Sequence, residues 1–480
     1  MTNVDHSEFV STKQGCNQKE VIYVIIISAL GIFFRNICIP WIFLGKRFNT
    51  SVISYWFKFI IDVIFIVAPP LLSLTIFANH LEHLLIILAT STVILLFFVA
   101  FEYYQHPFGH SMKNSWNRII DETYHPTTFV TYLRASTMIL TVCAILAVDF
   151  PIFPRRFSKT DSHGHSLMDT GVSAAVFISG LSSRMARSQS SGRPRNPRFT
   201  KWYTSSTFLL FLIGFARMIV LEFVGYPQHV NEYGIHWNFF FTMAVVRIAY
   251  TFLPRKFPFA TSIVLGVCHQ TLLNSGYQYW ILTEGENQRE NLIAANAEGI
   301  FSLLGYLTIF YASLAVGDIL ASTCIRIKSW IRRAFHMAFL SFLMYVCQVI
   351  SEQHLDQPSR RVVNLTYIFS QLFLMIGATS LLLFIQMFNI VVHSSNVPQF
   401  SNGETPFDSL TPCLCESINL HSLEYFLLSN VLTGIVNMSI NAHETRDETI
   451  SLSILTVYMF IGVFIVHSLA FRRTKIVHSE

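Results

Sequence analysis

The stretch TFVTYLRASTMILTVCAILAVDF, residues 128–150, is long and apolar enough to cross a membrane as a single helix. Its only charged residues are Arg134 and Asp149. About 20 apolar residues in a helix cover the roughly 30 Å of hydrocarbon in a bilayer. Similar runs recur from Val21 to Phe471, and the 480-residue chain has a mean hydropathy of +0.47 with 13% charged residues. The composition therefore indicates an all-α, polytopic integral membrane protein and excludes an ordinary soluble domain.

The apolar runs predict about thirteen membrane spans joined by short polar loops. They cover residues 21–44, 52–77, 83–101, 128–150, 167–183, 203–224, 237–253, 258–282, 300–322, 334–351, 363–390, 420–440 and 448–471. We expect a polar N-terminal tail at residues 1–20, one multi-span domain at residues 21–471, and a basic tail at residues 472–480. Because the tail is polar and the next run is long enough to span, we expect no cleaved signal peptide.

The basic residues predict how the chain is threaded through the membrane. The loop RMARSQSSGRPRNPRFTK, residues 184–201, carries only basic charges, and the C-terminal tail begins with RRTK. Basic loops face the cytosol in most membrane proteins. With an odd number of spans, the N-terminus then lies on the luminal side and the C-terminus in the cytosol.

One basic cluster does not follow this threading. In AVDFPIFPRRFSKT, residues 147–160, the side chains of Arg155, Arg156 and Lys159 fall on the luminal side, where Lys and Arg are otherwise sparse. Topology therefore does not explain the cluster, and we expect a binding or catalytic reason for it.

The same segment combines groups that could carry out acyl or phosphoryl chemistry. Asp149 falls at the C-terminal end of the predicted fourth span, where burial and the helix dipole disfavour its ionised form, as suits a proton acceptor. Pro151 and Pro154 end the helix. The cations beyond them could stabilise an oxyanion or hold a phosphate. Residue chemistry alone slightly favours another interpretation, in which the cations bind lipid headgroups and Asp149 is their ion-pair partner.

Three further polar segments precede predicted spans. HGHSLMDTGVS (163–173) contains Asp169, which fits an N-cap better than a catalyst. NEYGIHWNFFFTM (231–243) contains His236 and Asn238, which could be interfacial residues or line a substrate site. ENLIAANAEGIFSLLGY (290–306) contains Asn296, whose simplest role is a polar start to a helix. Within the spans, Lys58 and Asp62 are spaced to neutralise each other on one helix face. No Walker A, G-x-S-x-G, H-E-x-x-H or H-x-x-x-x-D acyltransferase motif occurs.

Four of these segments, taken in order, resemble the inositol acyltransferase family of GPI-anchor biosynthesis. They are LAVDFPIFPRRFSKT, SLMDTGVS, EYGIHWNFFFT and AANAEGIFSLLGY. The family comprises phosphatidylinositol-glycan class W of animals and its fungal GPI-anchored wall transfer counterpart, and the resemblance extends over essentially the whole chain.

The resemblance implies a multi-pass enzyme of the endoplasmic reticulum membrane. Such an enzyme moves a fatty acyl chain, usually palmitoyl, from acyl-CoA to the inositol 2-hydroxyl of glucosaminyl-phosphatidylinositol. The aspartate and lysine that the family uses in catalysis correspond to Asp149 and Lys159. We further expect Arg155, Arg156, Asp169, His236, Asn238 and Asn296 to contact substrate. We expect no metal, prosthetic group or nucleic acid, with acyl-CoA as co-substrate.

Two other classes of protein fit the span count. A lipid transporter or flippase would place its essential charges near the middle of the bilayer, in broken helices. In this sequence the unusual charges instead lie at a helix end and in the adjoining loop. The other class is a non-catalytic subunit of a membrane complex.

Overall fold

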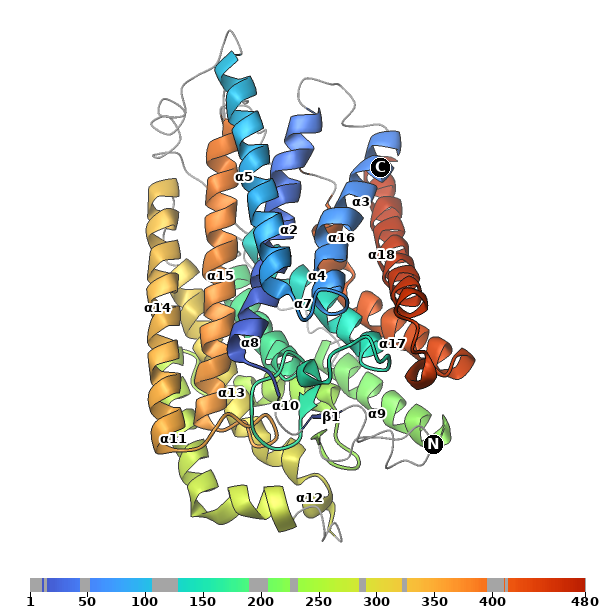
Figure 1. Cartoon of the computed structure of the whole chain (residues 1–480). Coiled ribbons are helices and arrows are strands. Elements are labelled where there is room, and N and C mark those ends of the chain that lie inside the picture. Colours follow the sequence, from blue (N-terminus) through green and yellow to red (C-terminus); the bar gives the residue numbers. More distant parts are fainter. Residues whose placement is uncertain are drawn as a thin grey trace. The chain divides into compact units, whose positions relative to one another are not determined.

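A computed structural model describes the chain at residues 11–12, 15–43, 52–105, 128–189, 206–224, 232–284, 291–321, 326–394, 410 and 413–479. Helices dominate this part of the chain (Figure 1). Within these ranges the only strands are β1 (Ser11–Thr12) and β2 (Lys159–Thr160), which pair in parallel. The chain folds into two compact units. Unit 1 contains residues 1–17, 155–323 and 339–377, and unit 2 contains residues 18–154, 324–338 and 378–480.

Unit 2 is built from helices at the two ends of the chain. They are α2 (Gln18–Phe43), α3 (Val52–Asp62), η2 (Val63–Val67), α4 (Ala68–Ser73), α5 (Leu81–Gln105), α7 (Thr128–Ala147), α16 (Leu414–Leu420), α17 (Ser422–Ser439), η10 (Ala442–Glu444) and α18 (Glu448–Ser479). Gly31 on α2 faces η2 at close range, because a Cβ at this position would lie 2.1 Å from the carbonyl oxygen of Phe65. Because lipid provides no hydrophobic driving force for helix association, close packing of this kind at small residues helps to hold membrane helices together.

Unit 1 is built around α13 (Ala297–Ala321). Its other elements are η3 (Arg155–Phe157), α8 (Thr170–Gln189), α9 (Ser206–Val224), α10 (Phe239–Phe252), α11 (Pro258–Leu272), η6 (Leu273–Tyr277), η7 (Trp280–Glu284) and α12 (Leu292–Ala295). Two long helices, α14 (Ile327–His354) and α15 (Leu365–Ser394), have one part in each unit. α13 packs against α8, α10 and α11. At the α8 contact, a Cβ on Gly180 would lie 1.9 Å from the Oγ of Ser313.

The helices confirm a polytopic membrane protein. Eight helices in the described residues are long and apolar enough to cross a bilayer: Gln18–Ile42, Val52–Ser73, Leu81–Phe101, Thr128–Ala147, Ala297–Ala321, Ile327–His354, Leu365–Ile390 and Glu448–Arg473. Three shorter apolar helices cover Thr170–Ser183, Thr207–Val220 and Phe239–Phe252. Each of the predicted spans contains a helix. The number of crossings and the orientation stay predictions.

Several predicted boundaries were wrong for local reasons. α7 ends at Ala147, because Pro151 cannot continue a helix and disfavours helical backbone just before it. The span predicted at 258–282 is helical to Leu272, and beyond it Gly276 has a φ of 107° and bends the chain. α15 begins at Leu365 rather than at residue 363, because Val363 has a φ of 51°.

Candidate active site

The AVDFPIFPRRFSKT segment runs from unit 2 into unit 1 through a series of turns. A backbone hydrogen bond of 3.1 Å from Asp149 to Leu146 closes the first turn after α7. Phe150, Phe153 and Phe157 have no exposed surface and anchor the segment in the core. The boundary between the units falls after residue 154. The two predicted catalytic residues are therefore each held by contacts within their own unit.

Asp149 is held by an amide in unit 2. It is 4% exposed and accepts a hydrogen bond of 2.7 Å from the Nδ2 of Asn437 on α17. The sequence placed Asp149 in the last turn of a helix, but the helix ends two residues earlier. An amide donor at this distance favours the ionised carboxylate, which is the form that can accept a proton.

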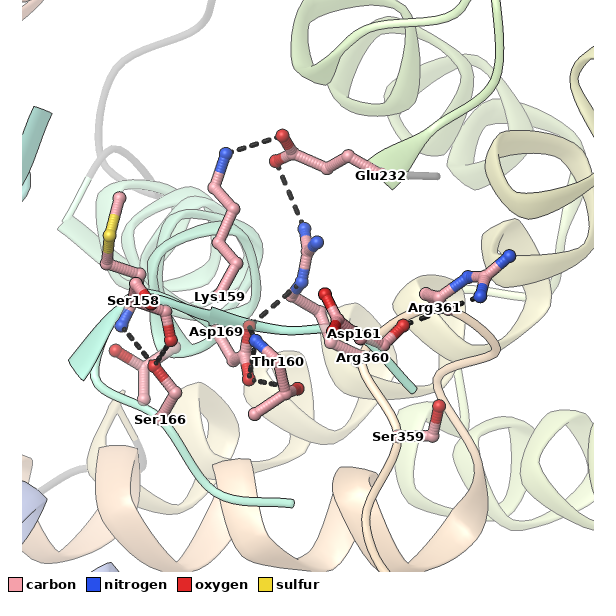
Figure 2. A network of polar contacts seen from close by, with 12 residues as sticks. Ser158, Lys159, Thr160, Asp161, Ser166, Asp169, Glu232, Ser359, Arg360 and Arg361 are labelled. Atoms are coloured by element: carbon pink, nitrogen blue, oxygen red, sulfur yellow. Dashed lines mark hydrogen bonds and ion pairs between the residues drawn. The ribbon is translucent and has the colours of Figure 1, made fainter. Parts of the chain in front are cut away.

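Lys159 begins a closed series of polar contacts in unit 1, drawn in Figure 2. Its Nζ lies 2.5 Å from the Oε2 of Glu232, and the Oε1 of Glu232 accepts a 3.0 Å hydrogen bond from the Nη1 of Arg360. The Nε of Arg360 lies 3.0 Å from the Oδ1 of Asp169. The Oδ2 of Asp169 accepts a 2.7 Å hydrogen bond from the Oγ1 of Thr160, the residue after Lys159. We call these five residues the loop ring.

The loop ring is sealed at one end and open at the other. The side chains of Asp169 and Arg360 are 3% and 4% exposed, whereas those of Glu232 and Lys159 are 17% and 24% exposed. Two cations and two carboxylates balance one another, which offsets the cost of removing them from water. The open end presents an ammonium and a carboxylate that a substrate can reach.

The pKa values of the two carboxyl groups in the loop ring are shifted in opposite directions. Burial raises the pKa of Asp169 to about 6, although Arg360 and the hydrogen bonds from Thr160 oppose the shift. Burial also acts to raise the pKa of Glu232, but Lys159 and Arg360 outweigh it and lower that pKa to about 2. Glu232 is therefore ionised throughout the physiological range, and Asp169 loses its charge in mildly acidic solution.

The loop that carries Arg360 adopts an uncommon backbone conformation. Val363 has a φ of 51°, a region that β-branched residues rarely occupy. It packs against α13, where a Cβ on Gly305 would lie 2.6 Å from the Cγ1 of Val363. The Nε2 of His269 on α11 lies 2.9 Å from the carbonyl oxygen of Val362. These contacts from two helices hold the arginine in place.

The N-terminal tail supplies a strand beside Lys159. In the pairing of β1 with β2, Ser11 lies opposite Lys159. Further along, the backbone N–H of Cys16 donates to the carbonyl oxygen of His165 at 2.7 Å. Gly15 has a φ of 65°, and a Cβ there would lie 2.3 Å from the same oxygen. The tail therefore helps to fix the backbone of the predicted catalytic lysine.

Arg155 and Arg156 are half-buried in η3, immediately before β2. The guanidinium of Arg156 lies 5.0 Å from the ring centroid of Phe157, a contact that orients the cation. Their predicted role as phosphate ligands stays a prediction.

Asp169 stands at the position before α8 where the sequence weighed an N-cap against a catalyst. Its carboxylate instead bonds to Thr160 and Arg360. Its carbonyl oxygen accepts a 2.6 Å hydrogen bond from the hydroxyl of Tyr367 on α15. Asp169 thus braces β2 against the loop that carries Arg360.

The predicted substrate residues of the next two segments hold the loop that carries Glu232. The Oδ1 of Asn296 accepts a 2.8 Å hydrogen bond from the backbone of His236. The Oδ1 of Asn238 accepts hydrogen bonds from two backbone N–H groups in the first turn of α10, which makes it the N-cap. The side chain of His236 is exposed. Substrate contact by these residues stays a prediction.

Three charged residues that meet around this site were missed from the sequence: Glu232, Arg360 and Arg361. Arg361 donates a 3.0 Å hydrogen bond to Glu298 on α13, beside the contacts of Arg360. Glu232 lies in a segment that drew attention for its histidine and asparagine. In the predicted threading, the Arg360–Arg361 doublet falls, like Arg155–Arg156, on the side where basic residues are sparse, and the same anomaly could have identified it.

The arrangement offers a carboxylate for proton transfer and an ammonium for anion binding. Among the residues that the structure describes, no group of three or more His, Cys, Asp and Glu side chains could hold a metal ion. Within unit 1, Lys159 and the partly exposed Glu232 present charged groups that suit contact with a charged substrate, and unit 2 holds the carboxylate of Asp149.

Comparison with known proteins agrees with the resemblance seen in the sequence. The family model described as GWT1 matches residues 3–469. GPI-anchored wall transfer protein 1 of Schizosaccharomyces pombe is 33% identical over 351 residues, 71% of this chain and 72% of its own. Glucosaminyl-phosphatidylinositol-acyltransferase PIGW of Bos taurus is 30% identical over 491 residues, 96% of each chain. Its Homo sapiens namesake is 29% identical over 496 residues, again 96% of each. The chain therefore belongs to the GWT1 family.

Proposed function

We propose that this protein is an acyltransferase of GPI-anchor biosynthesis. It transfers a fatty acyl chain, palmitoyl, from acyl-CoA to the inositol 2-hydroxyl of glucosaminyl-phosphatidylinositol. The observation that carries the proposal is the family match over residues 3–469, together with near full-length relatives named glucosaminyl-phosphatidylinositol-acyltransferase. The charged groups at the open end of the loop ring support it, because both substrates carry phosphate.

In the proposed reaction, Asp149 accepts the proton of the inositol 2-hydroxyl as its oxygen attacks the thioester carbonyl carbon. A carbon–oxygen bond forms, the carbon–sulfur bond breaks, and the CoA thiolate takes up a proton. Lys159 stabilises the oxyanion or binds the acidic end of a substrate. The hydrogen bond from Asn437 supports the ionised state that Asp149 needs. Because the thioester is already activated, the reaction requires no metal or prosthetic group.

The remaining predicted site residues act on the substrates in different ways. Arg155 and Arg156 hold phosphate, from the inositol lipid or from CoA. His236 presents an exposed ring to the acceptor. Asp169, Asn238 and Asn296 contact the acceptor and also fix the loops around it, through bonds of their polar groups within the protein.

We propose that the chain crosses the endoplasmic reticulum membrane thirteen times, with its N-terminus in the lumen. Contacts between loops support this threading. In this threading, one side of the membrane carries the loops at residues 151–166, 225–236, 283–299 and 352–362. Lys159 contacts Glu232, Glu232 contacts Arg360, and Arg361 contacts Glu298, which joins these four loops within unit 1.

The test is transfer of labelled palmitate from palmitoyl-CoA to a glucosaminyl-phosphatidylinositol analogue by the purified protein. A transporter, a flippase or a non-catalytic subunit would give no acylated product. The variants Asp149→Asn and Lys159→Ala should each reduce transfer at least about a hundredfold while the protein accumulates normally. Lys256→Ala, which removes an exposed lysine from the loop before α11, should keep wild-type activity. Full activity in either site variant would contradict the roles proposed for Asp149 and Lys159.

A further inference from the structure

We propose that Glu232 binds the ammonium group of the glucosamine ring and thereby selects acceptors that carry a free amine. The inference rests on the proposed function, because it takes the acceptor from that function. Glucosamine bears a primary amine that is protonated near neutral pH, and an amine-selective site needs a carboxylate that the sugar can reach. Glu232 is not among the site residues that the sequence predicted.

Access distinguishes Glu232 from the two other acids that pair with Arg360 and Arg361. The side chain of Glu232 is 17% exposed, whereas those of Asp169 and Glu298 are 3% and 1% exposed. An acceptor can therefore reach Glu232 without opening the buried part of unit 1.

The carboxylate of Glu232 keeps capacity for a further donor. Its Oε2 accepts from Lys159 at 2.5 Å and its Oε1 accepts from Arg360 at 3.0 Å. A carboxylate has about four acceptor positions, so roughly two are left. Figure 2 shows Glu232 between these two cations, with Lys159 reaching it from β2 and Arg360 from the loop before α15. Because Lys159 and Arg360 lower the pKa of Glu232 to about 2, the carboxylate is charged near neutral pH, where the amine is protonated.

The position of Glu232 beside Lys159 gives the amine a second effect. The loop ring is electrically balanced, so an ammonium that binds at the remaining acceptor positions of Glu232 weakens the attraction between Glu232 and the ammonium of Lys159. Glu232 stays fixed through Arg360, which is 4% exposed and pairs with Asp169 on its other side. The sugar's ammonium thus weakens the hold on Lys159, and Lys159 becomes available to the oxyanion. A sugar with a hydroxyl at that carbon leaves Lys159 bound to Glu232.

The experiment compares two acceptors on one enzyme preparation. They are glucosaminyl-phosphatidylinositol and the glucosyl analogue, in which a hydroxyl replaces the amine. We expect wild-type kcat/KM to favour the amine by about tenfold or more, equivalent to about 1.4 kcal/mol. In Glu232→Gln, which keeps the size but removes the charge, the ratio should fall to near one. Glu232→Asp, which keeps the charge, should retain most of the preference.

The ratio is independent of protein level, so a partly unstable variant remains informative. Glu352→Gln is the matched control, because Glu352 is a partly exposed acid of unit 1 that pairs with His165 at 3.3 Å. It should keep the wild-type ratio. A wild-type ratio in Glu232→Gln, or a wild-type enzyme that uses both acceptors equally, would overturn the inference and leave the acyltransferase function intact. No product from the amine acceptor with wild-type enzyme would count against the proposed function itself.

Discussion

Unit 2 contains a buried ion pair built from the same kinds of residue as the loop ring, yet closed to any ligand. Arg35 on α2 and Asp62 on α3 lie 2.6 Å apart, and neither side chain has exposed surface. Asp62 also accepts a 2.7 Å hydrogen bond from the backbone N–H of Leu414, and Arg35 donates a 2.9 Å hydrogen bond to the carbonyl oxygen of Leu410. We call Arg35 and Asp62 the helix ion pair.

The comparison shows that exposure, more than charge, separates a structural cluster from a candidate site. The helix ion pair joins three parts of unit 2 and has no side exposed to an incoming substrate. The loop ring has a sealed end at Asp169 and Arg360 and an open end at Glu232 and Lys159. A group at the open end can exchange a protein partner for a substrate partner.

Breaking the helix ion pair should have the largest effect. Arg35→Ala leaves the Asp62 carboxylate buried without its cation, which typically costs about 3–5 kcal/mol. We expect little folded protein, and a strongly lowered melting temperature for whatever can be purified in detergent. Lys159→Ala should accumulate normally and be inactive, because it removes a partly exposed cation. Arg473→Ala, at an exposed position on α18, should match wild type in both measurements. Equal melting temperatures for Arg35→Ala and wild type would remove the contrast between the two clusters.

Asp149 could belong to a structural cluster, like the helix ion pair, or to a reactive site, and its contact with Asn437 allows a test. Asn437→Ala removes the amide that donates to Asp149 at 2.7 Å, and a hydrogen bond to a charged group contributes about 1.5–3 kcal/mol. We expect about a tenfold loss of acyl transfer. The acidic limb of the pH–rate profile should move to higher pH, because the ionised carboxylate loses a donor.

Asn430→Ala is the control for this substitution. Asn430 is exposed on the same helix and bonds only along it, to the carbonyl oxygen of Phe426 at 2.8 Å. It should leave both the rate and the profile unchanged. A lowered rate in Asn437→Ala with an unmoved profile would assign Asn437 a purely structural role.

The helical membrane class could be read from the sequence because apolar length alone determines it. Ends of helices were less accurate, since they depend on single residues. Pro151 shortened α7, and the left-handed backbone of Val363 delayed α15. The conformation of Val363 depends on its packing against Gly305 on α13, a contact between distant parts of the chain. No local pattern in the sequence reports such a contact.

The site was predictable as a set of segments, but only partly as residues. Spacing drew attention to Lys58, which does interact with Asp62, but not to Arg35, whose guanidinium comes from another helix and forms the direct ion pair. Likewise, Glu232 meets Lys159 from a loop 73 residues further along the chain, and Arg360 meets Glu232 from a loop 128 residues beyond that. Threading indicates which loops share a side of the membrane, but not which side chains touch.

Asp169, at the sealed end of the loop ring, should make the stability of the protein depend on pH. The pKa of Asp169 is raised from 3.8 to about 6 on folding, so the folded state binds a proton that the unfolded state releases. Stability from this group therefore rises as pH falls from 7 through 6, by about 1 kcal/mol at pH 5. Glu232 contributes stability above pH 4.5 that is lost only as pH falls toward 2, so it is constant in this window.

The measurement is the melting temperature of wild type and Asp169→Asn between pH 7 and pH 5. Wild type should gain stability relative to Asp169→Asn as the pH falls, because the asparagine does not titrate. Asp161→Asn, in the same loop, should follow wild type. Parallel curves for wild type and Asp169→Asn would contradict a protonation of Asp169 in this range.

The smallest effect should come from the strand that flanks the open end. Gly15→Ala places a Cβ only 2.3 Å from the carbonyl oxygen of His165, which is too close for two non-bonded atoms. Residue 15 also has a φ of 65°, a backbone conformation that alanine disfavours. The tail must shift, and β1 with it, so Lys159 loses backbone support while its own side chain is unchanged. We expect about a threefold loss of acyl transfer and no change in melting temperature. Gly171→Ala, where a Cβ meets nothing within 4 Å, should preserve activity. If Gly15→Ala instead lowered the melting temperature as Arg35→Ala does, the tail would be part of the packed core of the protein and not a support for the open end of the loop ring.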